Sequence, residues 1–365
     1  MATSTFAPKP RPRAHDSAGL RRSRNACVFG AFLIALAVGC GRPDGKPPET
    51  LEQVVAFGPT IELQENAAVI NVTPDVTPDP LGGFLVADER EGQLRRYTRE
   101  GALLWNIGKK GSGPGEFRSV ATVLRLPNGQ VLAAELSGSF TLFDSAGTAA
   151  LEQIRTPFLH VQDMEVVDDS TLLVAARLEG RGGTGPSLHM WDIRENRVRR
   201  SFFDPFEAAP NKTAAVMAGW SKAAIRGDTV AAVFALSDTL YFFALDGRPR
   251  GKLPIPFRDF RPVPAETPRG GSDPVKRANF FSSFDYVADL HWFSDGRLLI
   301  PYQSLAAEQA LTRTYHLFAM DRAGRRLFEV RNAPRLLTAE PASSTLFFVA
   351  PGSEVPNRWA LARLR

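Results

Sequence analysis

Residues 123–147, VLRLPNGQVLAAELSGSFTLFDSAG, contain short apolar runs separated by residues that favour tight turns. Val131–Ala134 and Phe140–Phe143 are two of the runs, and Asn128-Gly129 and Ala146-Gly147 stand at two of the breaks. Turn residues that tolerate a positive φ favour hairpins between strands of about five residues. The stretch therefore predicts antiparallel strands joined in sequence order, in an all-β fold.

The same order of strands and turns recurs from about residue 54 to the end of the chain. A first set of turns lies at Gly82-Gly83, Asn128-Gly129, Asp168-Asp169, Gly227-Asp228, Asp295-Gly296 and Ser343-Ser344. A second set follows one strand pair later, at Glu100-Gly101, Ala146-Gly147, Glu195-Asn196, Asp246-Gly247 and Ala323-Gly324. The unit of four strands occurs about six times, which predicts a β-propeller with six four-stranded antiparallel blades.

The turn positions also divide the chain into blades. We expect the six blades to cover 67–108, 117–156, 157–204, 217–256, 284–330 and 333–365. The last contains three clear strands, so an N-terminal strand around Thr60–Gln64 is expected to complete it and to remove the open sheet edge. A β-sandwich is the competing fold, but six repeats over roughly 300 residues exceed what one sandwich usually holds.

Part of the chain resembles a known repeat family. Gly111–Phe117, GSGPGEF, is followed by Val123–Ala134 and Phe140–Gly147, and together these segments look like an NHL-type repeat. Gly83–Asp88 is similar to the second strand of the same repeat, so the resemblance covers residues 80–150. It implies a six-bladed propeller, but the fold serves many activities and does not identify one.

An export signal precedes the repeats. Three arginines in Arg21–Arg24 lead into the apolar run Ala26–Val38, and Gly39 and Cys40 follow. A basic start, a short apolar middle and small residues before a cut site are typical of a secretory signal. With Cys40 directly after them, the segment resembles a bacterial lipobox, whose cysteine is lipidated. Ordinary cleaved secretion and a buried helix are the alternatives, since 13 apolar residues are too few to span a membrane.

This signal sets the expected domain organisation and location. Residues 1–39 are the predicted signal peptide with an N-terminal extension, 40–53 the lipidated cysteine with a flexible tether, and 54–365 the propeller. Gly41 stands where an aspartate would resemble an inner-membrane retention signal, which favours the periplasmic side of the outer membrane in a Gram-negative cell. The expected membrane partner is therefore reached through the lipid on Cys40.

Charge and cysteine content restrict the function classes. Removing residues 1–40 takes away six of the 44 basic and one of the 39 acidic residues, so the mature chain keeps 38 of each. A neutral chain has no long-range field that would attract nucleic acid. The two cysteines, Cys27 and Cys40, both lie in this N-terminal part, so the propeller has no disulfide, catalytic thiol or cysteine metal ligand.

The long connections are expected on one face of the propeller, because loops between second and third strands and between blades share a face. These connections are 108–116, 178–186, 204–216, 257–283, 303–312 and 350–357. The largest combines aromatic and basic side chains suited to a protein, an acidic peptide or a carbohydrate. The candidate ligand-binding residues are Arg258, Arg261, Arg269, Lys276, Arg277 and Phe280. In the alternative interpretation this loop only packs over the rim and buries Phe280 and Phe281.

Catalytic signatures are absent from the sequence: it has no Gly-x-Ser-x-Gly elbow, phosphate loop or dinucleotide fingerprint. His160, Asp163, Asp289 and His291 are a weak candidate for a divalent-metal site, with polar channel lining as the other interpretation. No catalytic residue and no cofactor are assigned. The sequence thus favours an envelope-anchored, non-catalytic binding or scaffold propeller, with a metal-dependent hydrolase or lyase at the channel mouth as the alternative.

Overall fold

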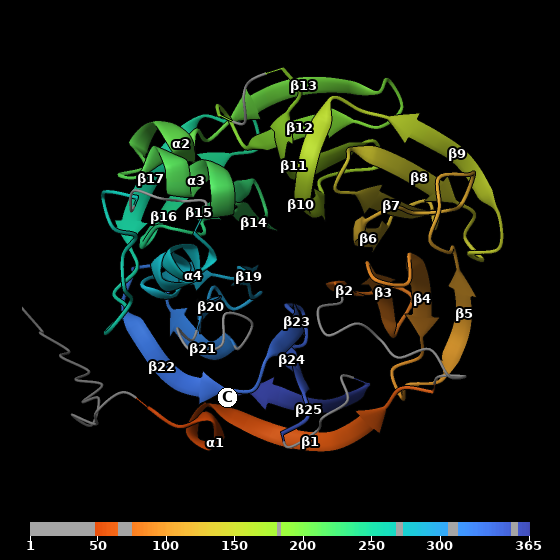
Figure 1. Cartoon of the computed structure of the whole chain (residues 1–365). Helices are drawn as coiled ribbons and strands as arrows, with labels where there is room; N and C mark the ends of the chain where they lie inside the picture. Colours follow the sequence, from red (N-terminus) through yellow and green to blue (C-terminus); the bar gives the residue numbers. More distant parts are fainter. Residues whose placement is uncertain (1–47, 65–74, 181–183, 268–272, 306–312, 352–356) are drawn as a thin grey trace, which may run out of the picture. The chain divides into compact units, whose positions relative to one another are not determined.

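The computed structural model describes residues 48–64, 75–180, 184–267, 273–305, 313–351 and 357–365, which belong to one unit, Lys46–Arg365. Within this unit the strands form six antiparallel sheets around a central axis (Figure 1). The predicted all-β, six-bladed propeller is therefore confirmed. The predicted Cys40 and signal peptide lie outside the described residues.

The first three blades follow one another along the chain. Blade 1 contains β2 (Asp75–Pro78), β3 (Phe84–Asp88), β4 (Gln93–Tyr97) and β5 (Leu103–Ile107). Blade 2 contains β6 (Val120–Arg125), β7 (Val131–Glu135), β8 (Ser139–Phe143) and β9 (Ala150–Arg155). Blade 3 contains β10 (Phe158–Val166), β11 (Thr171–Leu178), β12 (Leu188–Asp192) and β13 (Arg197–Phe202).

The remaining blades complete the ring. Blade 4 contains β14 (Ser221–Arg226), β15 (Thr229–Phe234), β16 (Thr239–Ala244) and β17 (Pro249–Pro254). Blade 5 contains β18 (Asp285–Val287), β19 (His291–Trp292), β20 (Leu298–Leu305), β21 (Arg313–Met320) and β22 (Arg326–Ala333). Blade 6 contains β23 (Leu336–Glu340), β24 (Thr345–Val349), β25 (Arg358–Leu364) and the N-terminal β1 (Val55–Glu62).

The N-terminal strand closes the ring as expected. Strand β1 pairs antiparallel with β25, with Val55 opposite Leu364 and Glu62 opposite Arg358. It begins five residues earlier than the sequence indicated. A short helix, α1 (Leu51–Val54), precedes it and packs its buried Leu51 and Val54 against blades 5 and 6. The end of the segment that we interpreted as a tether is thus part of the folded unit.

Burial changes from the inside to the outside of each blade. The second strands β3 and β7 are buried along their whole length, because neighbouring sheets cover both of their faces. These strands are rich in Val, Leu, Ala and Phe, as is typical of strands without a solvent face. The outermost strand β9 is largely exposed.

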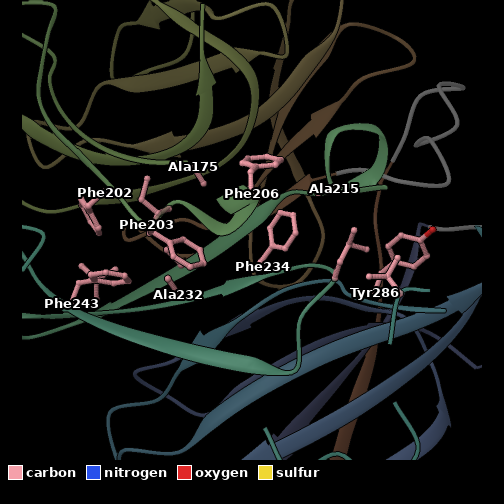
Figure 2. Packing of buried hydrophobic residues seen from close by; sticks show 14 of the residues in the cluster. Ala175, Phe202, Phe203, Phe206, Ala215, Ala232, Phe234, Phe243 and Tyr286 are labelled. Atoms are coloured by element: carbon pink, nitrogen blue, oxygen red, sulfur yellow. The ribbon is translucent and has the colours of Figure 1, made fainter. Parts of the chain in front are cut away.

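The hydrophobic core is divided among the junctions between blades. The described residues form six clusters of buried apolar side chains, one at each junction. Figure 2 shows the junction of blades 3 and 4, where Phe202, Phe203 and Phe243 lie close together and Phe206 faces Phe234. Each sheet buries one face against each neighbour, so the blades stabilise one another around the ring.

The other helices lie in connections between blades. Helices α2 (Pro205–Ala208) and α3 (Lys212–Ala218) join blades 3 and 4, and α4 (Pro274–Ser282) joins blades 4 and 5. Among the described residues, no helix has the length and apolar character needed to cross a membrane.

Candidate functional site

The long connections define one face of the propeller, which we call the long-loop face. Helices α2, α3 and α4 all lie on it, in front of blades 4 and 5 in Figure 1. The opposite face carries the predicted tight turns between first and second strands, several with a positive φ, such as Gly129 and Gly296. Rigid blades thus present their irregular segments on one side, where binding residues are often found.

The start of the long connection between blades 4 and 5 is anchored to blade 5. The rings of Phe257 and Phe260 stack 4.8 Å apart, and Phe257 also packs 4.9 Å from Tyr302. The backbone N–H of Arg258 donates to Glu329 Oε2 at 2.8 Å. The Arg258 guanidinium pairs with Glu49 at 2.7 Å. Arg258 therefore holds the loop and the N-terminal segment in place.

Arg261 has an even stronger structural attachment. Its Nε and Nη2 donate to Asp285 Oδ1 at 2.9 and 2.6 Å, and its backbone N–H donates to Oδ2 at 3.0 Å. The Asp285 carboxylate is fully buried, so Arg261 supplies the charge that it needs. Arg261 is thus occupied within blade 5.

Helix α4 carries three more of the predicted binding residues. Its N-cap Asp273 accepts hydrogen bonds from the backbone N–H groups of Val275 and Lys276. The side chains of Val275, Lys276 and Arg277 are exposed, whereas Phe280 is buried and packs against Phe284, just before β18. Arg269 lies outside the described residues. Among the described candidates, Lys276 and Arg277 are therefore the exposed cations that form no ion pair, whereas the partly exposed Arg258 and Arg261 are paired with carboxylates.

The central channel contains a cluster of charged side chains. A cavity of about 300 Å³ is lined by residues from all six innermost strands, and its charged lining includes Asp75, Arg125, Asp163, Glu165, Lys222, Asp289 and His291. Lys222 Nζ lies 4.0 Å from Asp163 Oδ1 and 3.9 Å from Asp289 Oδ1. It also donates to the backbone carbonyl of Gln162 at 3.1 Å. One lysine thus connects carboxylates from blades 3 and 5.

A break in the innermost strand of blade 5 positions Asp289. Strands β18 and β19 both pair with β20, and the backbone N–H groups of Ala288 and Asp289, between them, approach the carbonyl of Pro301. The carbonyl of Pro301 faces the innermost strand, and the N–H of the same residue would point to the same side. Because proline has no N–H, the ladder of hydrogen bonds between β20 and the innermost strand is interrupted here. Asp289 Oδ2 then lies 3.3 Å from His291 Nε2.

The channel environment shifts the pKa values of its carboxyl groups in opposite directions. Burial raises the pKa of Asp75 to about 6 and that of Glu165 to about 8. Burial also raises the pKa of Asp163. Burial opposes ionisation of Asp289 as well, but His291 and Lys222 hold its pKa well below the usual range. Lys222 keeps its charge because its carboxylate neighbours outweigh the effect of burial and raise its pKa.

The four residues of the candidate metal site are not brought together. Asp163, Asp289 and His291 line the channel, but His160 lines a separate cavity on the long-loop face. Lys222 occupies the position between the two aspartates. In the described part of the chain, no group of three or more His, Cys, Asp or Glu side chains is arranged to hold a metal ion.

Blade 5 also contains a Ser–His–Asp group, but its hydrogen bonds run in the wrong direction for the histidine to activate the serine as a nucleophile. Ser304 Oγ donates to Asp285 Oδ1 at 2.8 Å and lies 3.1 Å from His316 Nε2. The backbone N–H of Asn332 donates to His316 Nδ1, so the proton of the neutral ring is on Nε2. Burial lowers the pKa of His316 to about 4, and the ring therefore donates to Ser304 instead of accepting its proton.

Sequence reasoning missed the residues that organise the channel, Lys222, Asp75 and Glu165. One signal was available: Asp163 and Glu165 are two residues apart, and alternate residues of a strand face the same side. The role of Lys222 depends on ion pairs with residues of two other blades, and no local sequence pattern indicates such pairs.

Comparisons with known proteins identify the fold and leave the family open. No protein-family model matches the chain, and no curated protein sequence matches it. A crystal structure of a protein from Bacteroides fragilis that is predicted to be exported has a TM-score of 0.58, with 13% identity over 87% of this chain and 97% of that one. A member of the DUF4221 family from Bacteroides vulgatus also has a TM-score of 0.58, with 8% identity over 86% and 98% of the two chains.

BamB from Moraxella catarrhalis is a more distant neighbour, with a TM-score of 0.47 and 10% identity over 85% of this chain and 100% of that one. At these identities the first two structures show a shared propeller fold, and the function must be argued from the residues of this chain.

Proposed function

We propose that the protein is an envelope-anchored, non-catalytic binding propeller that engages a protein or peptide partner through its long-loop face. The observation that carries this proposal is the exposed surface of α4. Val275 has 67% of its surface exposed, and the exposed Lys276 and Arg277 follow it. An apolar side chain next to two cations suits a partner that combines an apolar contact with carboxylates.

The interactions of the other charged groups support a binding role over a catalytic one. Lys222 pairs with Asp163 and with Asp289 in the channel, and Arg261 is bonded to Asp285. The Ser304–His316 contact is directed away from proton abstraction. These interactions stabilise the ring of blades, whereas the exposed Lys276 and Arg277 of α4 can pair with a partner.

The proposed anchor limits where the partner can be. We propose that residues 1–39 are a signal peptide and that Cys40 is lipidated, with the propeller itself of the NHL-repeat kind and located at the outer membrane of a Gram-negative cell. A fully extended chain from Cys40 to Pro48 spans at most about 28 Å. The partner would then lie close to the same membrane.

Lipidation is tested by metabolic labelling with an alkynyl fatty acid. The wild-type chain is expected to take up the label and to fractionate with membranes, and Cys40→Ser is expected to lose both properties. Cys27→Ser is the matched control, because its thiol lies inside the predicted signal. A Cys40→Ser chain that is still labelled contradicts the anchor.

The binding face is tested by site-specific photo-crosslinking in cells. A crosslinker is placed at Val275 on the long-loop face or at Leu81 on the opposite face, since these side chains have similar exposures of 67% and 64%. We expect a discrete adduct from Val275 and none from Leu81. The double variant Lys276→Glu/Arg277→Glu should abolish the adduct without lowering the melting temperature. Equal adducts from both positions would contradict the assignment of the face.

A further inference from the structure

A second cavity lies on the long-loop face, at the junction of blades 3 and 4. It has a volume of about 160 Å³ and is lined by β10, β11, α2 and the segment Val216–Ser221, which includes the end of α3. We call it the α3 cavity. An apolar cavity of about 150 Å³ holds one benzene molecule, so the α3 cavity has room for one ring-sized or branched-chain group.

Arg177 brings an uncompensated positive charge to this cavity. Its Nη2 donates to the carbonyls of Val216 and Gly219, at 2.7 and 3.1 Å. The guanidinium also lies 5.4 Å from the centre of the Phe206 ring. Among the described residues no carboxylate forms an ion pair with Arg177, and none of those that line the cavity carries a carboxylate. A partly buried guanidinium without a counter-ion favours an anionic ligand.

A distortion of β10 brings His160 to the same cavity. The register of β10 against β11 shifts between Leu159 and Asp163, and His160 has a φ of 52°. Such irregularities redirect side chains and are over-represented at binding sites. Here the shift places His160 at the α3 cavity while Asp163 lines the channel. Burial and Arg177 lower the pKa of His160, so its neutral ring offers a hydrogen bond without a second charge.

Aromatic and thioether groups form the apolar part of the cavity. The Trp220 ring stacks on Tyr286 with a centroid distance of 5.6 Å and an interplanar angle of 5°. The Phe206 ring packs against Phe234, as Figure 2 shows. Met217 at the cavity has 54% of its surface exposed. The rings are thus held in place, and the flexible Met217 can adapt to a ligand.

We propose that the α3 cavity binds a carboxylate that is attached to one ring-sized or branched apolar group. The carboxylate contacts Arg177 and the apolar group lies against Phe206, Met217 and Trp220. A free aromatic acid and the C-terminal residue of a peptide both present this chemistry. The inference rests on the proposed binding role of the long-loop face and assigns it a specific subsite.

The experiment compares three probes by isothermal titration and ligand-observed NMR with the full chain in mild detergent. The probes are phenylacetate, the peptide acetyl-Ala-Ala-Phe with a free carboxylate, and the same peptide as its C-terminal amide. We expect at least one acid to bind with a Kd on the order of 1 mM, as the small number of ligand atoms implies. That acid should bind at least about tenfold more tightly than the peptide amide, because a charge-assisted hydrogen bond is lost in the amide.

Met217→Glu tests the location without removing the hydrogen bonds of Arg177 to α3. The new negative charge should weaken acid binding at least about tenfold, by repulsion or by pairing with Arg177. Leu151→Glu is the matched control, because it adds the same charge at a similarly exposed position of the outer strand β9, 53% against 54% for Met217, and should leave acid binding unchanged. Arg177→Gln should also remove the preference for the acid, provided that circular dichroism shows a folded ring.

Each outcome decides the proposal. Binding of phenylacetate alone, of the peptide acid alone or of both supports it, and the first two identify the source of the carboxylate. Three results overturn it. They are no acid binding at a ligand concentration about tenfold above the expected Kd, equal affinity for the peptide acid and the peptide amide, and unchanged acid affinity of the Met217→Glu variant. A crosslinked adduct from Val275 without any acid binding would refute the α3 cavity as a binding site and would still support the proposed binding face.

Discussion

The charged cluster of the channel allows the most direct test of how the blades are held together. In wild type, Lys222 lies about equally far from Asp163 and Asp289, with side-chain exposures of 15%, 20% and 32%. The change Lys222→Met keeps the length of the side chain and removes the positive charge. Both carboxylates then lose their compensating cation in a partly buried site.

The expected cost follows from this geometry. Removing one partner of a buried ion pair destabilises a protein by about 3–5 kcal/mol. A unit of roughly 300 residues has an unfolding entropy near 0.6 kcal/mol/K, so the melting temperature should fall by about 5–8 °C at pH 8. The loss should be smaller at pH 5, because burial already raises the pKa of Asp163 and the unpaired carboxylate takes up a proton.

Differential scanning calorimetry at pH 8 and pH 5 measures both effects. Lys252→Met is the control, since Lys252 is an exposed lysine on the outer strand β17 and should change the melting temperature little. Adding Asp289→Asn to Lys222→Met should restore part of the stability, because the double variant leaves one fewer uncompensated charge. A Lys222→Met protein as stable as wild type at pH 8 would refute the idea that this lysine joins the blades.

Three other changes test separate parts of the structure. Burial raises the pKa of Glu165 to about 8, above its ordinary value near 4.5, so wild type should lose stability as the pH rises from 4.5 to 8. In a melting series against pH, Glu165→Gln should be more stable than wild type at pH 8 and similar to it at pH 5. Arg261→Met should cost about 2–3 kcal/mol by chemical unfolding, because a buried carboxylate loses its cation, and should leave the long-loop-face adduct intact. Gly219→Ala should cost about 1–3 kcal/mol, because its Cβ would lie 2.4 Å from the Ala215 carbonyl oxygen, whereas Gly58→Ala meets nothing closer than 3.7 Å.

The fold was predictable because its determinants are local. Most of the tight turns contain a residue with a positive φ, such as Gly129 or Gly296, and these residues recur at blade spacing. Apolar runs between the turns fix which strands are buried. The closing strand was predictable because blade 6 lacked one strand and an antiparallel sheet leaves an edge to fill.

The roles of the loop residues were harder to predict, because a sequence does not show what a loop side chain contacts. Arg261 and Lys276 belong to the same basic and aromatic segment, yet Arg261 is bonded to the buried Asp285 and Lys276 is exposed. The difference depends on where the loop crosses blade 5. Phe280 illustrates the same point, since it lies in the core where the alternative interpretation placed it.

Strand periodicity explains why part of the channel could be predicted and part could not. Residues two apart on a strand face the same side, and Asp163 with Glu165, like Asp289 with His291, do line one cavity. His160 is an odd number of positions from Asp163, and the shifted register of β10 carries it to the other cavity. Grouping His160 with the channel residues ignored this alternation. Lys222, in contrast, connects β10 with the break between β18 and β19 only because ring closure brings three blades together, so its role follows from tertiary structure alone.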